Sequence, residues 1–81
     1  MDDIKSKIRD VIIKVTRDYD IDLSDDTKPL LECGMDSVDF STVLIGVEDH
    51  FEISFTEADM DRIASVEQIA LTVAACIEKR A

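Results

Sequence analysis

The residues with the clearest chemical potential are Asp36 and Ser37, which open an amphipathic segment that ends at Phe51. The Asp36 carboxylate can cap the first turn of a helix, with Asp39 three residues further on. Ser37 would then lie among backbone N–H groups at the positive end of the helix dipole. Such a position favours a phosphate group once one is attached. The pattern therefore predicts that Ser37 is a modified residue rather than a catalytic one.

A nucleophilic role for Ser37 would need a general base nearby. The only histidine, His50, follows thirteen residues later, which is about 20 Å along the same helix. Cys33 lies closer to Ser37, but no second histidine is present to activate its thiol. We therefore expect no catalytic residue, and the chain is not expected to be an enzyme.

The acidic run Asp18, Asp20 and Asp22 begins like a calcium-binding loop. Such a loop needs glycine at its sixth position and glutamate at its twelfth. This chain has Leu23 and Pro29 at those positions, so the match fails. No metal site is predicted.

Charge limits the possible partners. The 81 residues contain nineteen acids and nine bases, for a formal net charge of −10. This balance argues against nucleic acid, which is bound by clustered Lys and Arg. It favours protein partners with basic surfaces.

Length and composition predict one domain over residues 1–81. No apolar run approaches the ~18 residues of a membrane span, and the start does not resemble a signal peptide. A soluble, cytoplasmic protein is therefore expected. Cys33 and Cys76 are too few for a disulfide framework or a metal site, and each is expected to be a small buried apolar residue.

Hydrophobic periodicity predicts an all-α fold, a small four-helix bundle with three longer helices and one short helix. The apolar stripe of the first helix consists of Ile4, Ile8, Val11, Ile12 and Val15. Asp2 or Asp3 can cap this helix. Residues 19–36 show no sustained period. We expect this long loop to be ordered, with Leu30 and Leu31 packed against the core.

The second helix is expected from about Ser37 to Phe51. Its predicted inward face consists of Phe40, Val43, Leu44, Val47 and Phe51. Val38 and Ile45 share another face, while Asp39, Glu48 and Asp49 lie toward solvent.

Two capping boxes predict the remaining helices. Thr56 and Asp59 start a short third helix that is expected to bury Met60 and Ile63. Ser65 and Gln68 start the fourth helix. The predicted inward stripe of that helix consists of Val66, Ile69, Ala70, Val73, Cys76 and Ile77. Lys79 and Arg80 follow near its negative end.

The segment Leu30–Asp39 resembles the phosphopantetheine attachment site of acyl carrier proteins. That site commonly reads leucine, two variable residues, glycine, a variable residue and then aspartate-serine-leucine. Glu48–Ile53 is similar to the acidic-phenylalanine end of the second helix of the family. Phe55–Val66 is similar to its short third helix and the entry to the fourth. The resemblance covers essentially all 81 residues.

The resemblance implies that a phosphopantetheinyl transferase moves 4'-phosphopantetheine from coenzyme A onto Ser37, which would make the chain a phosphoprotein. The chain would then carry acyl intermediates as thioesters to partner enzymes of fatty acid, other lipid or polyketide biosynthesis. Partners with basic docking surfaces are implied to contact the second helix. The matching positions are Asp36, Val38, Asp39, Ile45, Glu48 and Asp49. A monomer is expected.

Several positions depart from the common family pattern. Val38 replaces leucine, and Ser41 and Thr42 stand where many carriers of fatty acid synthesis have valine and glutamate. Cys33 is unusual before the motif glycine. Gly46 lies inside a helix, where it costs ~0.5–1 kcal/mol against alanine. These departures favour a specialised carrier over a housekeeping one.

Two alternatives remain open at this point. The cargo could be an amino acid, as in stand-alone aminoacyl or peptidyl carriers, or the chain could be an unmodified acidic interaction module. Gly46 and the small Val47 also suggest space beneath the second helix. On helix propensity, Gly46→Ala is expected to raise the stability of the unloaded protein by about 1 kcal/mol.

Overall fold

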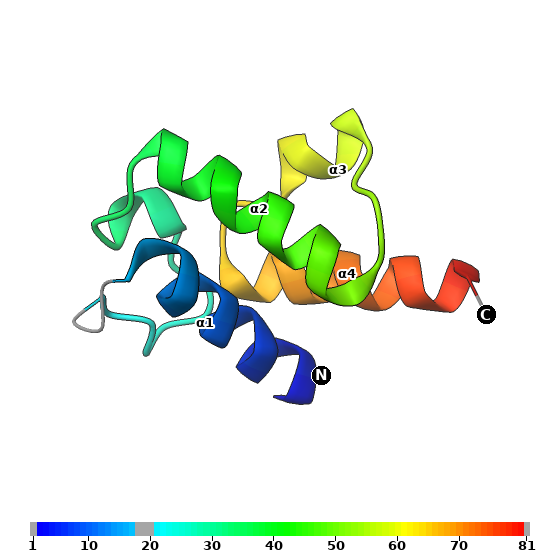
Figure 1. The fold of residues 1–81 in the computed structure, drawn as a ribbon, viewed down its shortest axis with the longest axis horizontal. Coiled ribbons are helices and arrows are strands. Elements are labelled where there is room, and N and C mark those ends of the chain that lie inside the picture. The colour runs from blue at the N-terminus through cyan, green and yellow to red at the C-terminus, as the bar shows by residue number, and fades with distance from the viewer. Residues whose placement is uncertain (1, 18–20, 81) are drawn as a thin grey trace.

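The computed structural model describes residues 2–17 and 21–80. The helices are α1 (Asp2–Thr16), the 3-10 helix η1 (Leu30–Glu32), α2 (Ser37–Phe51), α3 (Glu57–Arg62) and α4 (Val66–Arg80). Figure 1 shows their arrangement. The described residues form no strand. The predicted all-α fold, with three longer helices, one short helix and a loop between the first two long helices, is confirmed.

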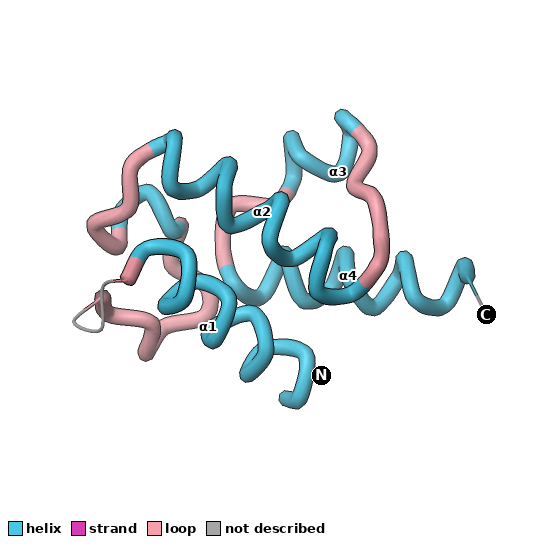
Figure 2. The backbone as a smooth tube through the Cα atoms, viewed as in Figure 1, coloured by secondary structure: helices cyan, strands magenta, loops and turns pink. Residues whose placement is uncertain are grey.

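The bundle is built on α1, which packs against both α2 and α4. Figure 2 shows the described part of the connection between α1 and α2, residues 21–36, at one end of the molecule, while the connection from α2 to α3 leaves the other end of α2. No helix of the described residues combines the length and apolar character that crossing a bilayer would require.

The three long helices bury the stripes that periodicity predicts. Ile8 and Ile12 of α1 are fully buried. The matching residues of the other long helices are Val43, Leu44 and Val47 of α2, and Val66, Ile69, Ala70 and Val73 of α4. Phe40 and Phe51 are half-buried and pack against this core. Burial of an aliphatic side chain contributes about 1.5–3 kcal/mol, so these stripes supply much of the driving force for the fold.

Two predicted core residues are exposed instead. Leu31 is 53 % exposed, whereas Leu30 is only 1 % exposed, because the tight η1 turn directs consecutive side chains to different sides. Met60 is 42 % exposed. The segment around α3 is held by the buried residues at its two ends, Phe55 and Ile63, so the helix itself does not bury Met60.

The expectation of space beneath α2 at Gly46 is also wrong. A Cβ at this position would lie 3.0 Å from Cγ1 of Val11 and 3.5 Å from Cγ2 of Val15. Gly46 therefore allows α1 and α2 to approach closely. The stiff Val11 side chain would have to shift to admit a methyl group, and this cost opposes the gain in helix propensity.

The predicted capping boxes are present with one variation. The Thr56 hydroxyl accepts from Asp59 N at 3.1 Å, and the Asp59 carboxylate accepts from Thr56 N at 3.0 Å. At α4, the Ser65 hydroxyl accepts from Gln68 N at 3.3 Å, but the Gln68 amide oxygen accepts from Ala64 N, one residue before the cap. Asp2 and Asp3, which were predicted to cap α1, are its first two residues, and Met1 and the side chains of Asp2 and Arg80 lie outside the described parts.

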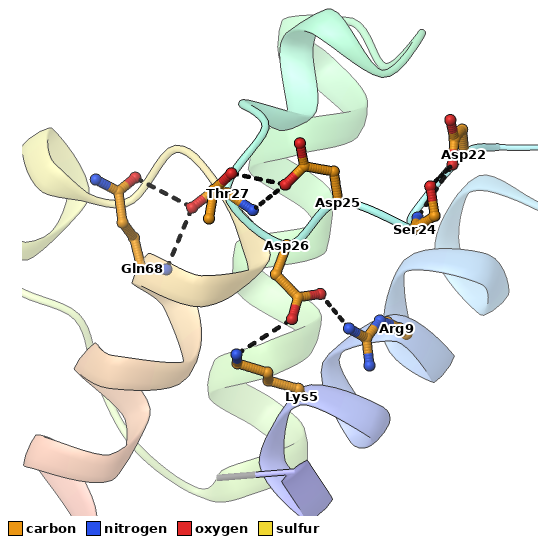
Figure 3. Close-up of polar contacts among 9 residues, drawn as sticks. Lys5, Arg9, Asp22, Ser24, Asp25, Asp26, Thr27 and Gln68 are labelled. Carbon is orange, nitrogen blue, oxygen red and sulfur yellow. Dashed lines mark hydrogen bonds and ion pairs between the residues drawn. The ribbon is translucent and has the colours of Figure 1, made fainter.

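Asp26 fixes the long loop to two helices. Its carboxylate forms ion pairs with Arg9 and, at 3.1 Å, with Lys5, both on α1. Figure 3 shows these two side chains pointing toward Asp26. The backbone carbonyl of Asp26 accepts from Glu67 N in α4 at 3.0 Å. The described part of the loop, residues 21–36, is therefore tied to the bundle as the prediction of order requires.

Candidate functional site

The predicted modification site lies at the start of α2. Gly34 has a φ of +100°, which an L side chain rarely adopts, and it turns the chain toward the helix. Met35 is buried and Asp36 is the N-cap residue, with φ −88° and ψ 174°. Ser37 is the first residue of α2, and its side chain is exposed.

The Asp36 carboxylate caps the helix as predicted. Its Oδ1 accepts from Asp39 N at 2.8 Å, while the Asp36 carbonyl accepts from Phe40 N at 2.9 Å. The N–H groups of the first turn have no partners inside a helix and carry partial positive charge. The local geometry therefore presents the Ser37 hydroxyl at a helix terminus that suits an anionic substituent.

The histidine of this chain is remote from that hydroxyl. His50 lies in the last turn of α2 and is exposed. Its ring packs edge-on against Phe51, with ring centroids 5.0 Å apart and planes inclined by 74°. Because Ser37 begins the same helix, His50 cannot serve as its general base.

Cys33 precedes the site but is not activated. Burial raises the pKa of the Cys33 thiol, and although Lys28 opposes this shift, the pKa stays above its ordinary value. The thiol points to the Pro29 carbonyl, with the two atoms 3.5 Å apart. Cys33 is therefore a protonated thiol at neutral pH. Cys33 and Cys76 are both free and half-buried, so each is less enclosed than predicted.

The exposed side of α2 carries the two apolar residues predicted for partner contact. Val38 is 72 % exposed and Ile45 is 63 % exposed. They are seven residues apart, which places them on one face of the helix. Asp39 is half-buried at the Ser37 end of α2, and Asp49 is exposed at the other end. The helix therefore presents apolar side chains between carboxylates.

Glu48 differs from the other acids predicted for partner contact. Its side chain is half-buried, and Oε2 accepts from Phe55 N at 2.7 Å. Its carbonyl accepts from Ile53 N at 3.0 Å. Glu48 therefore holds the chain between α2 and α3. No short sequence pattern indicates this bond, because its two residues are seven positions apart and the second lies beyond the helix.

Two open grooves on the described part of the surface lie away from Ser37. An open groove of about 420 Å³ runs between α3 and α4. Its lining includes Arg62 of α3 and Leu71, Cys76 and Lys79 of α4. A second groove, of about 430 Å³, shares Cys76 and Lys79 and continues to the α2–α3 connection.

Metal ligands do not gather in the described residues, where no group of three or more His, Cys, Asp or Glu side chains could hold an ion. Asp18 and Asp20 of the calcium-like run lie outside the described parts. The Asp22 carboxylate accepts from Ser24 N at 3.0 Å and from the Ser24 hydroxyl at 2.6 Å. Asp22 therefore forms a local turn.

Comparison with known proteins identifies the family. The family model described as the phosphopantetheine attachment site matches residues 6–73. The chain belongs to this family. No curated protein and no solved structure matches it.

Family membership settles the general class of function. The protein is a phosphopantetheine carrier, and domains of this family are carriers without catalytic activity. Their cofactor is 4'-phosphopantetheine. Carriers of this kind require a phosphopantetheinyl transferase and work with enzymes that handle acyl groups. The exposed hydroxyl of Ser37, at a helix N terminus, fits this group, because attachment needs an accessible oxygen and a place for a charged phosphodiester.

Proposed function

We propose that this protein is an acyl carrier whose 4'-phosphopantetheine is attached to Ser37. The observation that carries the proposal is the exposure of Ser37 at the first position of α2, directly after the capping residue Asp36. This position also lies inside the segment matched by the family model. In the same proposal, residues 1–81 act as one carrier domain.

Attachment requires the Ser37 hydroxyl to act as an acceptor. Its Oγ forms the new bond to the β-phosphorus of coenzyme A, adenosine 3',5'-bisphosphate leaves, and the hydroxyl proton passes to a base of the transferase. The base must come from the transferase because His50 lies at the far end of α2. When attached, the group supplies a terminal thiol that holds the acyl cargo as a thioester.

The start of α2 also stabilises the attached state. The phosphodiester is anionic, and the helix dipole favours negative charge in the first turn. Asp36 and Asp39 work against this effect, but their carboxylates also attract basic groups of the transferase. The site is therefore suited to receive an anionic group while a basic partner shields the neighbouring acids.

Partner enzymes are proposed to dock on the exposed face of α2. Val38 and Ile45 offer apolar contact, and Asp36, Asp39 and Asp49 offer charge for basic surfaces. Glu48 belongs to this set as well, although its carboxylate is also bonded to Phe55 N. Long-range attraction from a net charge of −10 would speed encounter with such partners. The same charge opposes self-association, which supports a monomer.

The proposed pathway is a specialised branch of lipid or polyketide synthesis. Val38 is smaller than the leucine common in the family, and Thr42 carries no charge where many carriers of fatty acid synthesis have glutamate. An aminoacyl or peptidyl cargo is the alternative. The strongly acidic composition favours the acyl cargo.

Intact mass spectrometry tests the attachment site. The unmodified protein is incubated with coenzyme A and a transferase of broad specificity. The unaltered chain should gain one phosphopantetheine group, and Ser37→Ala should gain none while keeping its helical circular dichroism. Ser41→Ala is the matched control, because Ser41 is exposed one turn further along α2. A Ser37→Ala variant that is fully modified would refute the proposal.

A further inference from the structure

Met35 stands out because of the residues around it. Among residues 31–42, all of which the structure describes, it is the only buried one, and it is just 4 % exposed. Gly34, Asp36 and Ser37 are exposed on either side of it. Cys33 and Phe40 of this stretch pack against the core while half-buried, whereas Met35 belongs to the same buried cluster as the three long helices.

The backbone shows how this connection is made. A Cβ on Gly34 would have nothing within 4 Å, so the space around it does not require a glycine. The φ of Gly34, +100°, does require a glycine, because only glycine adopts this region without strain. The turn at Gly34 directs Met35 inward, and the extended conformation of Asp36 then returns the chain to the surface, where its carboxylate accepts from Asp39 N.

We propose that Met35 is a positioning residue for the modification of Ser37. The inference rests on the proposed attachment of phosphopantetheine to Ser37. Insertion of the Met35 side chain into the core fixes the backbone two residues before Ser37, and with it the Asp36 cap and the start of α2. The transferase then meets a hydroxyl whose surroundings are already ordered.

The physical basis is the entropy of ordering. If Met35 is truncated, the exposed residues 36–38 lose their one buried neighbour and the first turn of α2 frays more readily. The transferase must then order this turn as it binds, which reduces the free energy left for binding and catalysis. We expect kcat/KM for phosphopantetheine transfer to fall on the order of tenfold in Met35→Ala.

Methionine suits this position because it is unbranched and adapts to irregular spaces. Leucine has a similar volume, so Met35→Leu should restore the rate to within about twofold. The exposed Met60 serves as a further control, and Met60→Ala should leave the rate unchanged, because its side chain is 42 % exposed on α3.

The experiment must separate positioning from general loss of stability. Val73→Ala is the matched variant, because Val73 is fully buried on α4, and its truncation also removes core packing. Each variant is assayed with coenzyme A and a broad-specificity transferase, at a temperature where circular dichroism shows that it is folded. Hydrogen exchange of the Asp39 amide, which donates to the cap, is measured in parallel.

The expected result is a slower transfer reaction and faster exchange of the Asp39 amide in Met35→Ala. Val73→Ala should lower the melting temperature yet keep both properties close to those of the unaltered chain. Equal transfer rates and equal exchange in Met35→Ala and Val73→Ala would overturn the inference. If Met35→Ala does not fold, Met35→Val carries the same comparison with a smaller loss of volume.

The two proposals fail in distinguishable ways. If the unaltered chain accepts no phosphopantetheine, the attachment proposal is wrong, and the Asp39 exchange still reports whether Met35 orders the turn. If the unaltered chain is modified and Met35→Ala reacts as fast, with unchanged exchange, only the role of Met35 is wrong.

Discussion

The two connections that flank α2 are held in opposite ways. The connection before it, described for residues 21–36, has one short 3-10 turn as its regular structure and yet is bonded to both α1 and α4. The connection after it, residues 52–65, contains a well-capped helix, but none of the residues of α3 is buried. Local order and attachment to the core are therefore separate properties in this molecule.

The connection before α2 depends on contacts between distant residues. Asp26 pairs with Lys5 and Arg9, and its carbonyl receives Glu67 N. A second backbone bond joins Leu30 N to the Ala64 carbonyl at 2.7 Å. These bonds fix the chain just before the turn that presents Ser37.

The connection after α2 depends on its ends. Glu48 accepts from Phe55 N, and Phe55 and Ile63 insert into the core on either side of α3. Between these points, α3 borders the open groove that it shares with α4. The difference indicates that the Ser37 end of α2 is fixed, while α3 can adjust without disturbing the packing of α1 against α2 and α4.

The largest expected effect is the loss of the Asp26 carboxylate. Asp26→Ala should lower the free energy of unfolding by about 1–2 kcal/mol, because it removes charged hydrogen bonds that are partly screened by solvent. Asp25→Ala is the matched control, because it removes the same charge from the preceding residue. The carboxylate of Asp25 bonds only locally, with Thr27. Urea denaturation of both variants measures the difference.

The comparison of Asp26→Ala with Asp25→Ala isolates the bonds of Asp26, because both variants reduce the net negative charge equally. Any general relief of repulsion is therefore shared, and the excess loss in Asp26→Ala reports the bonds to α1. Equal stability of the two variants would show that the loop does not depend on Asp26.

Acid should weaken the same connection. Burial raises the pKa of Asp26, but hydrogen bonds from Lys5 and Arg9 outweigh this, so the pKa lies below its ordinary value of 3.8. The unfolded chain therefore binds the proton first as the pH falls. The stability from Asp26 is complete above about pH 4 and is lost as the pH falls through the folded-state pKa.

The measurement is the midpoint of urea unfolding between pH 7 and pH 3. The unaltered chain should lose stability below about pH 4 more steeply than Asp26→Asn, which has no carboxylate to protonate. Asp22, Asp25 and Asp59 also have lowered pKa values and contribute with the same sign in both proteins. Identical acid slopes for the two proteins would contradict the assignment to Asp26.

The smallest expected effect concerns α3. Thr56→Ala removes one half of its capping box and should cost about 1 kcal/mol. Because no residue of α3 is buried, the effect should appear as faster hydrogen exchange within residues 57–62, with little change in α1. An equal increase in the exchange of α1 amides would show that α3 unfolds only together with the bundle, and the comparison between the two connections would then fail.

Local signals in the sequence were sufficient for part of this structure. The stripes of the three long helices follow from their period, and the caps at Asp36 and Thr56 follow from side chains that bond within three residues. Such interactions depend on neighbours along the chain, so their geometry is nearly independent of the rest of the fold.

Other features depend on contacts that no local pattern contains. The bonds of Asp26 to Arg9 and to Glu67 join elements far apart in the chain. Leu30 is buried and Leu31 is exposed because of how the η1 turn meets the core. At the site, Asp36 and Ser37 were recognisable from their motif, whereas Met35 occupies a variable position of that motif, so its burial could only be seen in the folded chain.

If Ser37 receives the phosphopantetheine group, the added mass must be located on Ser37. The modified protein is fragmented in the mass spectrometer, and fragments ending on either side of Ser37 are compared. The added mass should appear as soon as a fragment includes Ser37, and fragments covering residues 38–81 should never carry it. Added mass on Cys33, Ser41 or any other residue, with Ser37 unmodified, would show that Ser37 is not the attachment site.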